Sequence, residues 1–378
     1  MGSSSFGPFM SKWVKKNYPD VKSDLFSSFV VRMFNLAKDH GECGVMSPFV
    51  WMFIGSYEKL RNEIIDNRTL TSLIQLEYSG FAGATVPICT YTFHNSFIKG
   101  YKGGYVRLSD FVGAAVQAPK ALEAIGNPDC GWFYRRDAET FKQIPGIPIA
   151  YWASDALLDA FENAKQLSEY GKPRQGLATG ENARFVREWW EVDGCKSAYS
   201  CGSIQESIES ACKWFPYNKG GDFRKWYGNN SAVVNWENDG WEIRNYKDQN
   251  GKLLSRPQNT NCFFSPSITW SKISSGSIAF RFKPAGHVFD VAGTSVFSDQ
   301  KSLKYLQGAC NSSVIMRVAS MLSATLNFEV GQIATYPIIQ NEEQKPLVNN
   351  MVDSCRELSK ADWDSFETSW DFKRHPLV

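Results

Sequence analysis

Apolar residues at helical spacing stand near the beginning of the chain. They predict a helix over residues 23–40, with Ser23 as its N-cap and Gly41 as its C-terminal stop. The apolar face of this helix would be formed by Phe26, Phe29, Val30, Met33, Phe34 and Ala37. A second helix is predicted over residues 55–66.

Short apolar runs alternate with these helices and predict strands. One covers residues 43–46, and two others, residues 70–76 and 86–93, are rich in β-branched and aromatic residues. A Gly-containing loop, residues 79–85, joins the last two. Helix, strand, helix, strand, loop, strand is the order of the second half of a doubly wound α/β sheet, and the closing hairpin suits an antiparallel edge strand.

The pattern changes in the middle of the chain. Residues 104–150 are transitional and include a helix candidate at 112–125, followed by a break at Gly126-Asn-Pro-Asp. Beyond a predicted helix at 154–167, short strand-like runs alternate with Gly, Asn and Asp, and Trp and Tyr are frequent. We expect a domain boundary between residues 110 and 150, and a further helix from Asn182 to Val192.

Composition supports a folded chain without a global affinity for polyanions. Hydrophobic residues make up 43% and charged residues 21%, so a packed core can form. The net charge is only +2, so a basic surface must be local. The aromatic content of 14% favours strands, and aromatic side chains also stack on bases or sugars.

The cysteines and histidines do not predict a metal site. The nine Cys include no C-x-x-C pair, and the four His lie far apart in sequence. We interpret the cysteines as reduced thiols of a cytoplasmic protein. Met1–Pro8 lacks the pattern of a signal peptide, and no apolar run reaches the roughly 18 residues of a membrane span.

Several long strings resemble one family, the PglX-type adenine-specific DNA methyltransferases of BREX phage-defence systems. The resemblance extends over essentially the whole chain. The strings that carry it are Met1–Ser5, Lys15–Asp20, Lys22–Phe26, Gly176–Phe185, Lys213–Gly228, Ile268–Ser271 and Asp362–Phe372.

The resemblance implies transfer of a methyl group from S-adenosylmethionine (SAM) to the exocyclic amino group of a flipped-out adenine. That chemistry uses an Asn-Pro-Pro-Tyr or Asp-Pro-Pro-Tyr motif and a Gly-rich cofactor loop. The sequence contains neither tetrapeptide and no such loop before residue 40. We therefore expect a fragment that begins just after the motif, with no catalytic, cofactor-binding or metal-binding residues. SAM would be bound only in the intact enzyme, and this chain alone would be inactive.

With the resemblance, the predicted fold class is α/β: the C-terminal half of a Rossmann-like methyltransferase sheet, followed by a mixed α/β target-recognition domain. The expected segments are a partial catalytic domain (1–110), a linker (111–150), a DNA-binding target-recognition domain (151–340) and a C-terminal helical or interdomain segment (341–378).

Two site candidates come from the resemblance. Phe81 occupies the loop in which a Phe of related methyltransferases stacks on the flipped adenine; the alternative is a Phe packed on the sheet edge. Arg184, in the string that opens the second domain, is expected to contact phosphate or a base edge. The glycines Gly176 and Gly180 of this string would bring backbone N–H groups near a phosphate or, alternatively, form a structural turn.

A basic-aromatic cluster is the strongest candidate for a DNA contact. Cations interleaved with aromatic side chains suit nucleic acid, and the alternative is a solvated hairpin over an aromatic core. The cations are Lys213, Lys219, Arg224 and Lys225, and the aromatic residues are Trp214, Tyr217, Trp226 and Tyr227.

Weaker candidates for groove contacts stand on other predicted loops; for any one of them, simple solvation is the better interpretation. They are Arg256, Asn259, Thr269, Ser271, Lys272 and Arg281. The acidic string Asp362–Thr368 is interpreted as a helix start or an interdomain contact, without catalytic chemistry.

The expected partners are double-stranded DNA and the missing catalytic half or other phage-defence subunits, with no membrane and no metal. Two alternatives stay open: a stand-alone DNA-binding specificity subunit that works with a separate catalytic half, and an inert remnant of a disrupted gene. A carbohydrate-binding module is disfavoured by the family strings. An incomplete sheet would leave an unpaired edge, which predicts self-association.

Overall fold

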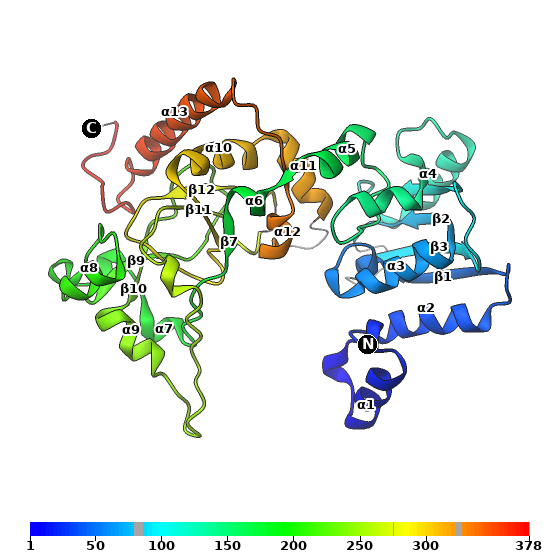
Figure 1. The fold of residues 1–378 in the computed structure, drawn as a ribbon, viewed down its shortest axis with the longest axis horizontal. Coiled ribbons are helices and arrows are strands. Elements are labelled where there is room, and N and C mark those ends of the chain that lie inside the picture. The colour runs from blue at the N-terminus through cyan, green and yellow to red at the C-terminus, as the bar shows by residue number, and fades with distance from the viewer. Residues whose placement is uncertain (79–85, 275, 323–326, 378) are drawn as a thin grey trace. The chain divides into compact units, whose positions relative to one another are not determined.

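The structure is a computed structural model that describes residues 1–78, 86–274, 276–322 and 327–377. By its internal contacts the chain divides into unit 1, Met1–Asn163, and unit 2, Ala164–Val378 (Figure 1). Both units combine helices with strands, so the predicted mixed α/β class is confirmed. The functional segments predicted from the sequence stay a prediction.

The N-terminal part of unit 1 is helical. It contains α1 (Pro8–Asn17), α2 (Leu25–Leu36) and α3 (Glu58–Asn67), with short 3-10 helices at Ser3–Ser5, Pro19–Val21, Phe49–Met52 and Gly55–Tyr57. The N-cap of α2 is Asp24 and not Ser23, because the Asp24 carboxylate accepts a hydrogen bond from the Phe26 backbone N–H at 3.2 Å. The helix ends at Leu36, before the predicted stop at Gly41.

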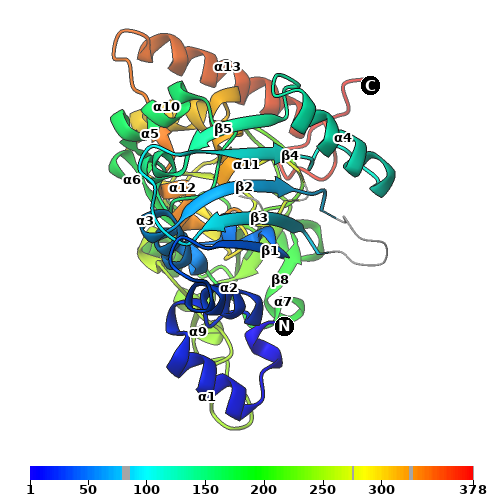
Figure 2. The same cartoon turned by 90° about the vertical axis from the view of Figure 1, so that its right-hand side faces the viewer.

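A five-stranded sheet forms the centre of unit 1. Its strands are β1 (Glu42–Pro48), β2 (Thr69–Gln75), β3 (Ile88–His94), β4 (Lys102–Arg107) and β5 (Phe133–Asp137). Their order is β1-β3-β2-β4-β5, as Figure 2 shows. Strand β3 is antiparallel to both β1 and β2, whereas β2 and β4 are parallel. The predicted edge position of the second hairpin strand is therefore wrong, because β3 lies between two strands.

Residues treated as transitional in the sequence extend this sheet. Strands β4 and β5 continue it beyond β2, and α4 (Ala114–Gly126) lies between them in sequence. A 3-10 helix, Ala138–Gln143, and α5 (Asp155–Asn163) complete the unit. The buried Tyr151 stacks on Tyr105 with ring centroids 5.0 Å apart and donates a hydrogen bond to Gln75 at 2.8 Å. The segment after β5 is thereby packed onto the sheet.

The described residues of unit 2 form three small sheets. The first has the order β13-β9-β10-β8, the second β12-β11-β14-β7, and the third pairs β15 with β6. The strands are β6 (Lys165–Gln166), β7 (Lys172–Arg174), β8 (Val186–Glu188), β9 (Trp214–Asn218), β10 (Ala232–Asn235), β11 (Ser267–Thr269), β12 (Arg281–Lys283), β13 (Val288–Phe289), β14 (Ser295–Phe297) and β15 (Pro337–Ile338).

Short helices and turns connect these strands. The α-helices are α6 (Leu167–Tyr170), α7 (Asn182–Phe185), α8 (Ile204–Glu209), α9 (Glu237–Arg244), α10 (Gln300–Cys310), α11 (Ser313–Leu322), α12 (Val330–Ala334) and α13 (Lys345–Trp363), and the 3-10 helices are Trp189–Glu191, Gly194–Lys196 and Thr260–Cys262. The predicted helix over 182–192 is wrong beyond Phe185, because Val186 pairs with Val234 of β10. The predicted helix over 154–167 ends at Asn163, and strand β6 follows.

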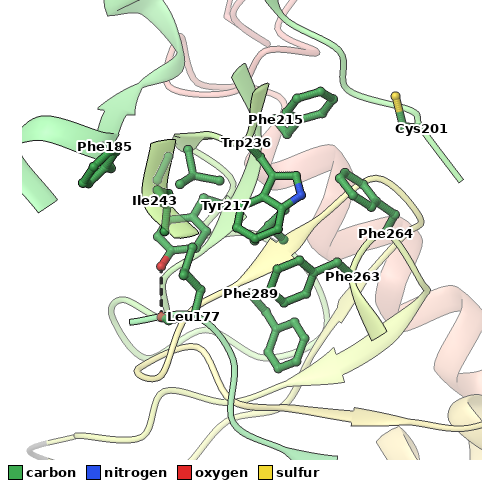
Figure 3. Packing of buried hydrophobic residues seen from close by; sticks show 13 residues of the cluster. Leu177, Phe185, Cys201, Phe215, Tyr217, Trp236, Ile243, Phe263, Phe264 and Phe289 are labelled. Atoms are coloured by element: carbon green, nitrogen blue, oxygen red, sulfur yellow. Dashed lines mark hydrogen bonds between the residues drawn. The ribbon is translucent and has the colours of Figure 1, made fainter. Parts of the chain in front are cut away.

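Aromatic side chains from distant parts of the chain fill the core of unit 2 (Figure 3). Trp236, Phe263 and Phe289 pack edge to face, with ring centroids 5.0 and 5.4 Å apart. The buried Tyr217 hydroxyl donates to Asp290 at 2.6 Å and lies 3.3 Å from the Leu177 carbonyl. Much of the aromatic content of unit 2 is therefore core, and is not available for stacking on bases.

Candidate nucleic-acid interface

A two-stranded loop, residues 246–256, protrudes from unit 2 beyond α7 and α9; we call it the finger (Figure 1). Its arms are joined by backbone hydrogen bonds from Leu254 N to Tyr246 O at 2.9 Å and from Asp248 N to Lys252 O at 2.9 Å. At the tip, the Asp248 carboxylate accepts from the backbone N–H groups of Asn250 and Lys252 at 2.8 and 2.9 Å. The turn is thus held by its own Asp side chain.

The base of the finger is anchored to the loop before α7. Ala178 and Arg256 exchange backbone hydrogen bonds at 3.0 and 2.7 Å. Gly180 has a φ of +81°, and a Cβ at this position would lie 2.8 Å from the Leu254 carbonyl oxygen. Ser255 is buried and donates to the carbonyl of Ile243. The string around Gly180 therefore forms a structural turn that supports the finger.

Arg184 lies beside this anchor and already has partners. Its guanidinium donates to Glu242 at 2.7 and 3.0 Å, and the group lies over the rings of Phe185 and Tyr246. The hydrogen bond with Glu242 raises the pKa of Arg184, so the side chain stays charged. About half of the side chain is exposed (49%), so a contact with DNA would have to compete with Glu242.

The finger carries cations that lack such partners. Lys247, Lys252 and Arg256 are exposed, and no side-chain hydrogen bond or ion pair involves them within the described part of the chain. The Asp248 carboxylate, the one acidic group in the finger, faces the backbone of the turn. Arg256 was predicted as a weak candidate, whereas Lys247 and Lys252 were missed. The turn string Asp248-Gln-Asn-Gly251 between two lysines is the sequence signal that identifies them.

The cations of the predicted basic-aromatic cluster differ in whether they have partners within the protein. Lys213 lies over the Trp214 ring at 5.7 Å. Arg224 donates to Asp362 and to the Tyr227 carbonyl, and Lys225 donates to the Asn311 carbonyl at 3.0 Å. Two of its four cations are thus used within the protein. Lys219 is partly exposed and has no side-chain hydrogen bond or ion pair among the described residues.

The partner of Arg224 corrects another expectation. Asp362 lies in the last turn of α13, so the predicted helix start at this string is wrong. Farther along, Lys360 donates to Asp364 and, at 2.9 Å, to Asp371, and Trp189 Nε1 donates to the Thr368 carbonyl at 3.0 Å. The contacts of the acidic string attach the C-terminal segment to the rest of unit 2.

Half of the weaker groove candidates are buried: Thr269, Ser271 and Arg281. Arg281 is 1% exposed, its guanidinium donates to Ser271 at 3.0 Å, and burial lowers its pKa to about 10. Thr269 is fully buried, and Lys272 pairs with Glu329 at 3.1 Å. A DNA contact by Arg281 does not fit this structure, because its side chain supports the backbone around Arg224.

Two further candidates have different outcomes. Asn259 is exposed, and its side-chain amide donates to the Gln175 carbonyl at 2.9 Å. Its backbone is left-handed, with a φ of +49°. Phe81, the predicted base-stacking residue, lies outside the described residues.

Unit 2 contains a cleft of about 980 Å³. Aromatic side chains line much of it, among them Trp189, Tyr199 and Trp370. His287 in its wall is buried, and its Nδ1 lies 3.2 Å from the Pro284 carbonyl. Because a carbonyl only accepts, Nδ1 carries the proton and Nε2 is left as a lone-pair acceptor. Burial lowers the pKa of His287 to about 3, so the ring is neutral.

The part of the chain that the structure describes contains no group of three or more His, Cys, Asp or Glu side chains that could hold a metal ion. None of the described helices is both long and apolar enough to cross a membrane.

Comparison with solved structures defines the class of fold. The Type IIL restriction-modification enzyme MmeI, in complex with DNA, matches 100% of this chain and 51% of its own, with a TM-score of 0.61 at 11% identity. A nuclease-deletion mutant of the Type ISP restriction-modification enzyme LlaGI, with a DNA substrate mimic, matches 93% of this chain and 33% of its own, with a TM-score of 0.54 at 10% identity. Residues 2–81 also match the family model described as Eco57I restriction-modification methylase. The fold is that of restriction-modification methyltransferase enzymes.

Relatives in sequence define the family more narrowly than the solved structures do. The adenine-specific methyltransferase PglX of Lacticaseibacillus casei (strain Zhang) is 35% identical over 384 residues, covering 100% of this chain and 32% of the relative. The adenine-specific methyltransferase BrxX of Escherichia coli O9:H4 (strain HS) is 33% identical over 385 residues, covering 100% of this chain and 30% of the relative. The resemblance to PglX-type adenine-specific methyltransferases is confirmed over the whole chain. The chain spans about a third of the length of these curated relatives.

Proposed function

We propose that this chain supplies duplex-DNA recognition to an adenine-specific DNA methyltransferase of a BREX or restriction-modification system. One observation carries the proposal: the protruding finger of unit 2 presents three cations without partners among the described residues, in a chain whose relatives are adenine-specific methyltransferases. Charges already neutralised inside a protein gain little from a phosphate, whereas unpaired ones release counterions from DNA when they bind. The DNA complexes of MmeI and LlaGI support the same role.

The residues of this chain do not fit SAM. A SAM site needs a Gly-rich turn between a strand and a helix N-terminus, where free backbone N–H groups face the ligand. After β4, the helix α4 begins at Ala114 with Gly113 as its N-cap, but the Gly113 N–H already donates to the Glu77 carboxylate at 2.9 and 3.0 Å. The sequence contains no Asn-Pro-Pro-Tyr motif. We therefore assign methyl transfer to other parts of the intact enzyme, and to this chain the binding of DNA.

Equilibrium binding tests the proposal directly. The 378-residue chain is titrated into a fluorescein-labelled 30-base-pair duplex, and anisotropy is followed between 50 and 200 mM salt. We expect binding with a negative slope of log affinity against log salt concentration. Absence of binding at 50 mM salt would refute the proposal. Incubation with labelled SAM and the same duplex should transfer no methyl group, and observed transfer would contradict the division of roles.

A further inference from the structure

We propose that the finger enters the major groove of duplex DNA, with Gln249 and Asn250 at the base edges and with Lys247, Lys252 and Arg256 at the phosphates. This inference rests on the proposed function and assigns it to one element.

The shape of the finger matches the groove. Neighbouring strands lie about 4.8 Å apart, so two arms with their side chains fit a major groove about 12 Å wide. The exposed part of one arm, residues 252–254, extends about 10 Å at the rise of a strand, which exceeds the groove depth of about 8.5 Å. The tip can therefore reach the base edges while the base of the finger stays outside the groove. Figure 1 shows that the finger projects away from the sheets of unit 2.

The finger is also prepared for insertion. Its tip is closed by the Asp248 carboxylate, and Gly251 takes the left-handed backbone, with a φ of +78°, that the turn requires. Its base is held by the reciprocal hydrogen bonds between Ala178 and Arg256. Less conformational freedom is then lost on binding than for a disordered loop.

The side chains divide into two groups by chemistry. Gln249 and Asn250 are exposed at the tip, and no side-chain hydrogen bond of theirs is found among the described residues. Amide side chains of this kind pair with the N6 and N7 edge of adenine in the major groove. Lys247 and Lys252 lie farther back, on the two arms, where a cation would meet the phosphates that flank the groove. The tip would therefore read the base sequence, and the arms would contribute affinity that does not depend on sequence.

The first experiment measures the salt dependence of binding by the full 378-residue chain. The double variant Lys247→Gln/Lys252→Gln should reduce the slope of log affinity against log salt by about 1.8, since each lost phosphate contact removes about 0.9. Between 50 and 200 mM salt, the affinity of the variant should then fall about twelvefold less than that of the wild type. The matched control is Lys301→Gln/Lys373→Gln, which makes the same charge change at two exposed lysines outside the finger.

The outcomes separate this inference from the proposed function. A wild-type chain that binds no duplex overturns both. Wild-type binding with an unchanged slope in the finger variant, or with an equal reduction in the control, leaves DNA binding intact and overturns the role of the finger. Binding to duplex RNA as strong as to DNA also overturns it, because the major groove of A-form RNA is too deep and narrow for side chains to read.

The second experiment tests reading by the tip. Duplexes selected from a randomised pool by the wild-type chain should share a preferred sequence, and Gln249→Ala/Asn250→Ala should lose the preference at one or two positions while keeping the salt slope. If that variant selects the same sequence as the wild type, the tip does not read bases. Both substitutions lie at exposed positions, so circular dichroism should show an unchanged fold.

Discussion

A histidine that is buried in the folded protein, and can take up a proton only on unfolding, should make unit 2 lose stability in weak acid. His287 is 6% exposed, and burial, assisted by the nearby Lys283, lowers its pKa to about 3 in the folded protein. In the unfolded chain the pKa returns to about 6.5. Between pH 6.5 and about pH 3, His287 therefore binds a proton in the unfolded chain but not in the folded protein. The loss of stability begins below pH 6.5 and is absent above it.

The magnitude follows from the pKa difference. Each pH unit between the two pKa values corresponds to about 1.36 kcal/mol, so the fall from pH 6.5 to pH 5 should cost about 2 kcal/mol. Other groups titrate in the same range, so the quantity to compare is the difference between the wild type and His287→Phe. This variant keeps the ring volume and has no group that titrates. It leaves the Pro284 carbonyl without its donor at both pH values, and that cost cancels.

Two measurements check this reasoning. Urea unfolding at pH 7 and pH 5 can be followed by tryptophan fluorescence, to which unit 2 contributes nine of the 13 Trp. The wild type should lose about 2 kcal/mol more than the variant between these pH values. With only four His in the chain, the ring signals are also resolvable by ¹³C-labelled NMR. A His287 signal that titrates near pH 6.5, or equal losses in both proteins, would refute the account.

Other substitutions test the packing around the site. Gly180→Ala should destabilise unit 2 by about 3 kcal/mol, because the backbone is left-handed there (φ +81°) and the new Cβ would lie 2.8 Å from a carbonyl oxygen. Gly251→Ala shares the left-handed backbone (φ +78°) but has open space around its Cβ, so it should cost only about 1 kcal/mol; equal losses in urea unfolding would contradict this. Asp362→Asn should change stability by less than about 1 kcal/mol, since its pair with Arg224 is largely solvent-exposed on the acidic side, and a much larger loss in the same assay would show that the contact is more than a surface pair. Lys283→Met should cost about 2 kcal/mol, because it leaves two buried oxygens and one partly buried oxygen without their donor; an unchanged urea midpoint would show that they find other donors.

Local patterns in the sequence determined much of unit 1. The predicted helix over 55–66 corresponds to α3, and the strand at 86–93 to β3, within a few residues. These elements depend on residues three or four apart in a helix and two apart in a strand, which are visible in one sequence. The long strings that resemble PglX-type proteins determined the family, and the relatives in sequence confirm it.

The tertiary structure decided which polar groups are free. Arg224 and Arg281 were both predicted as DNA contacts. In the structure, Arg224 is paired with Asp362 of α13, and Arg281 is buried beside Ser271. Their partners lie up to 138 residues away, so no local pattern contains them. The neighbours of β3 also depend on distant residues. A hairpin prediction places β3 beside β2, but it does not predict that β1 lies on the other side of β3.

The finger shows most clearly which features depend on local sequence and which depend on tertiary structure. The residues Asp248-Gln-Asn-Gly251 suit a turn, because Asp and Gly favour its backbone locally, but this turn was not among the elements predicted from the sequence. Only the tertiary structure decided that this turn stands at the end of a supported hairpin, because its base is held by Ala178, far away in sequence. Side-chain chemistry and local backbone preference are properties of the sequence, whereas exposure and pairing depend on which distant segments pack together.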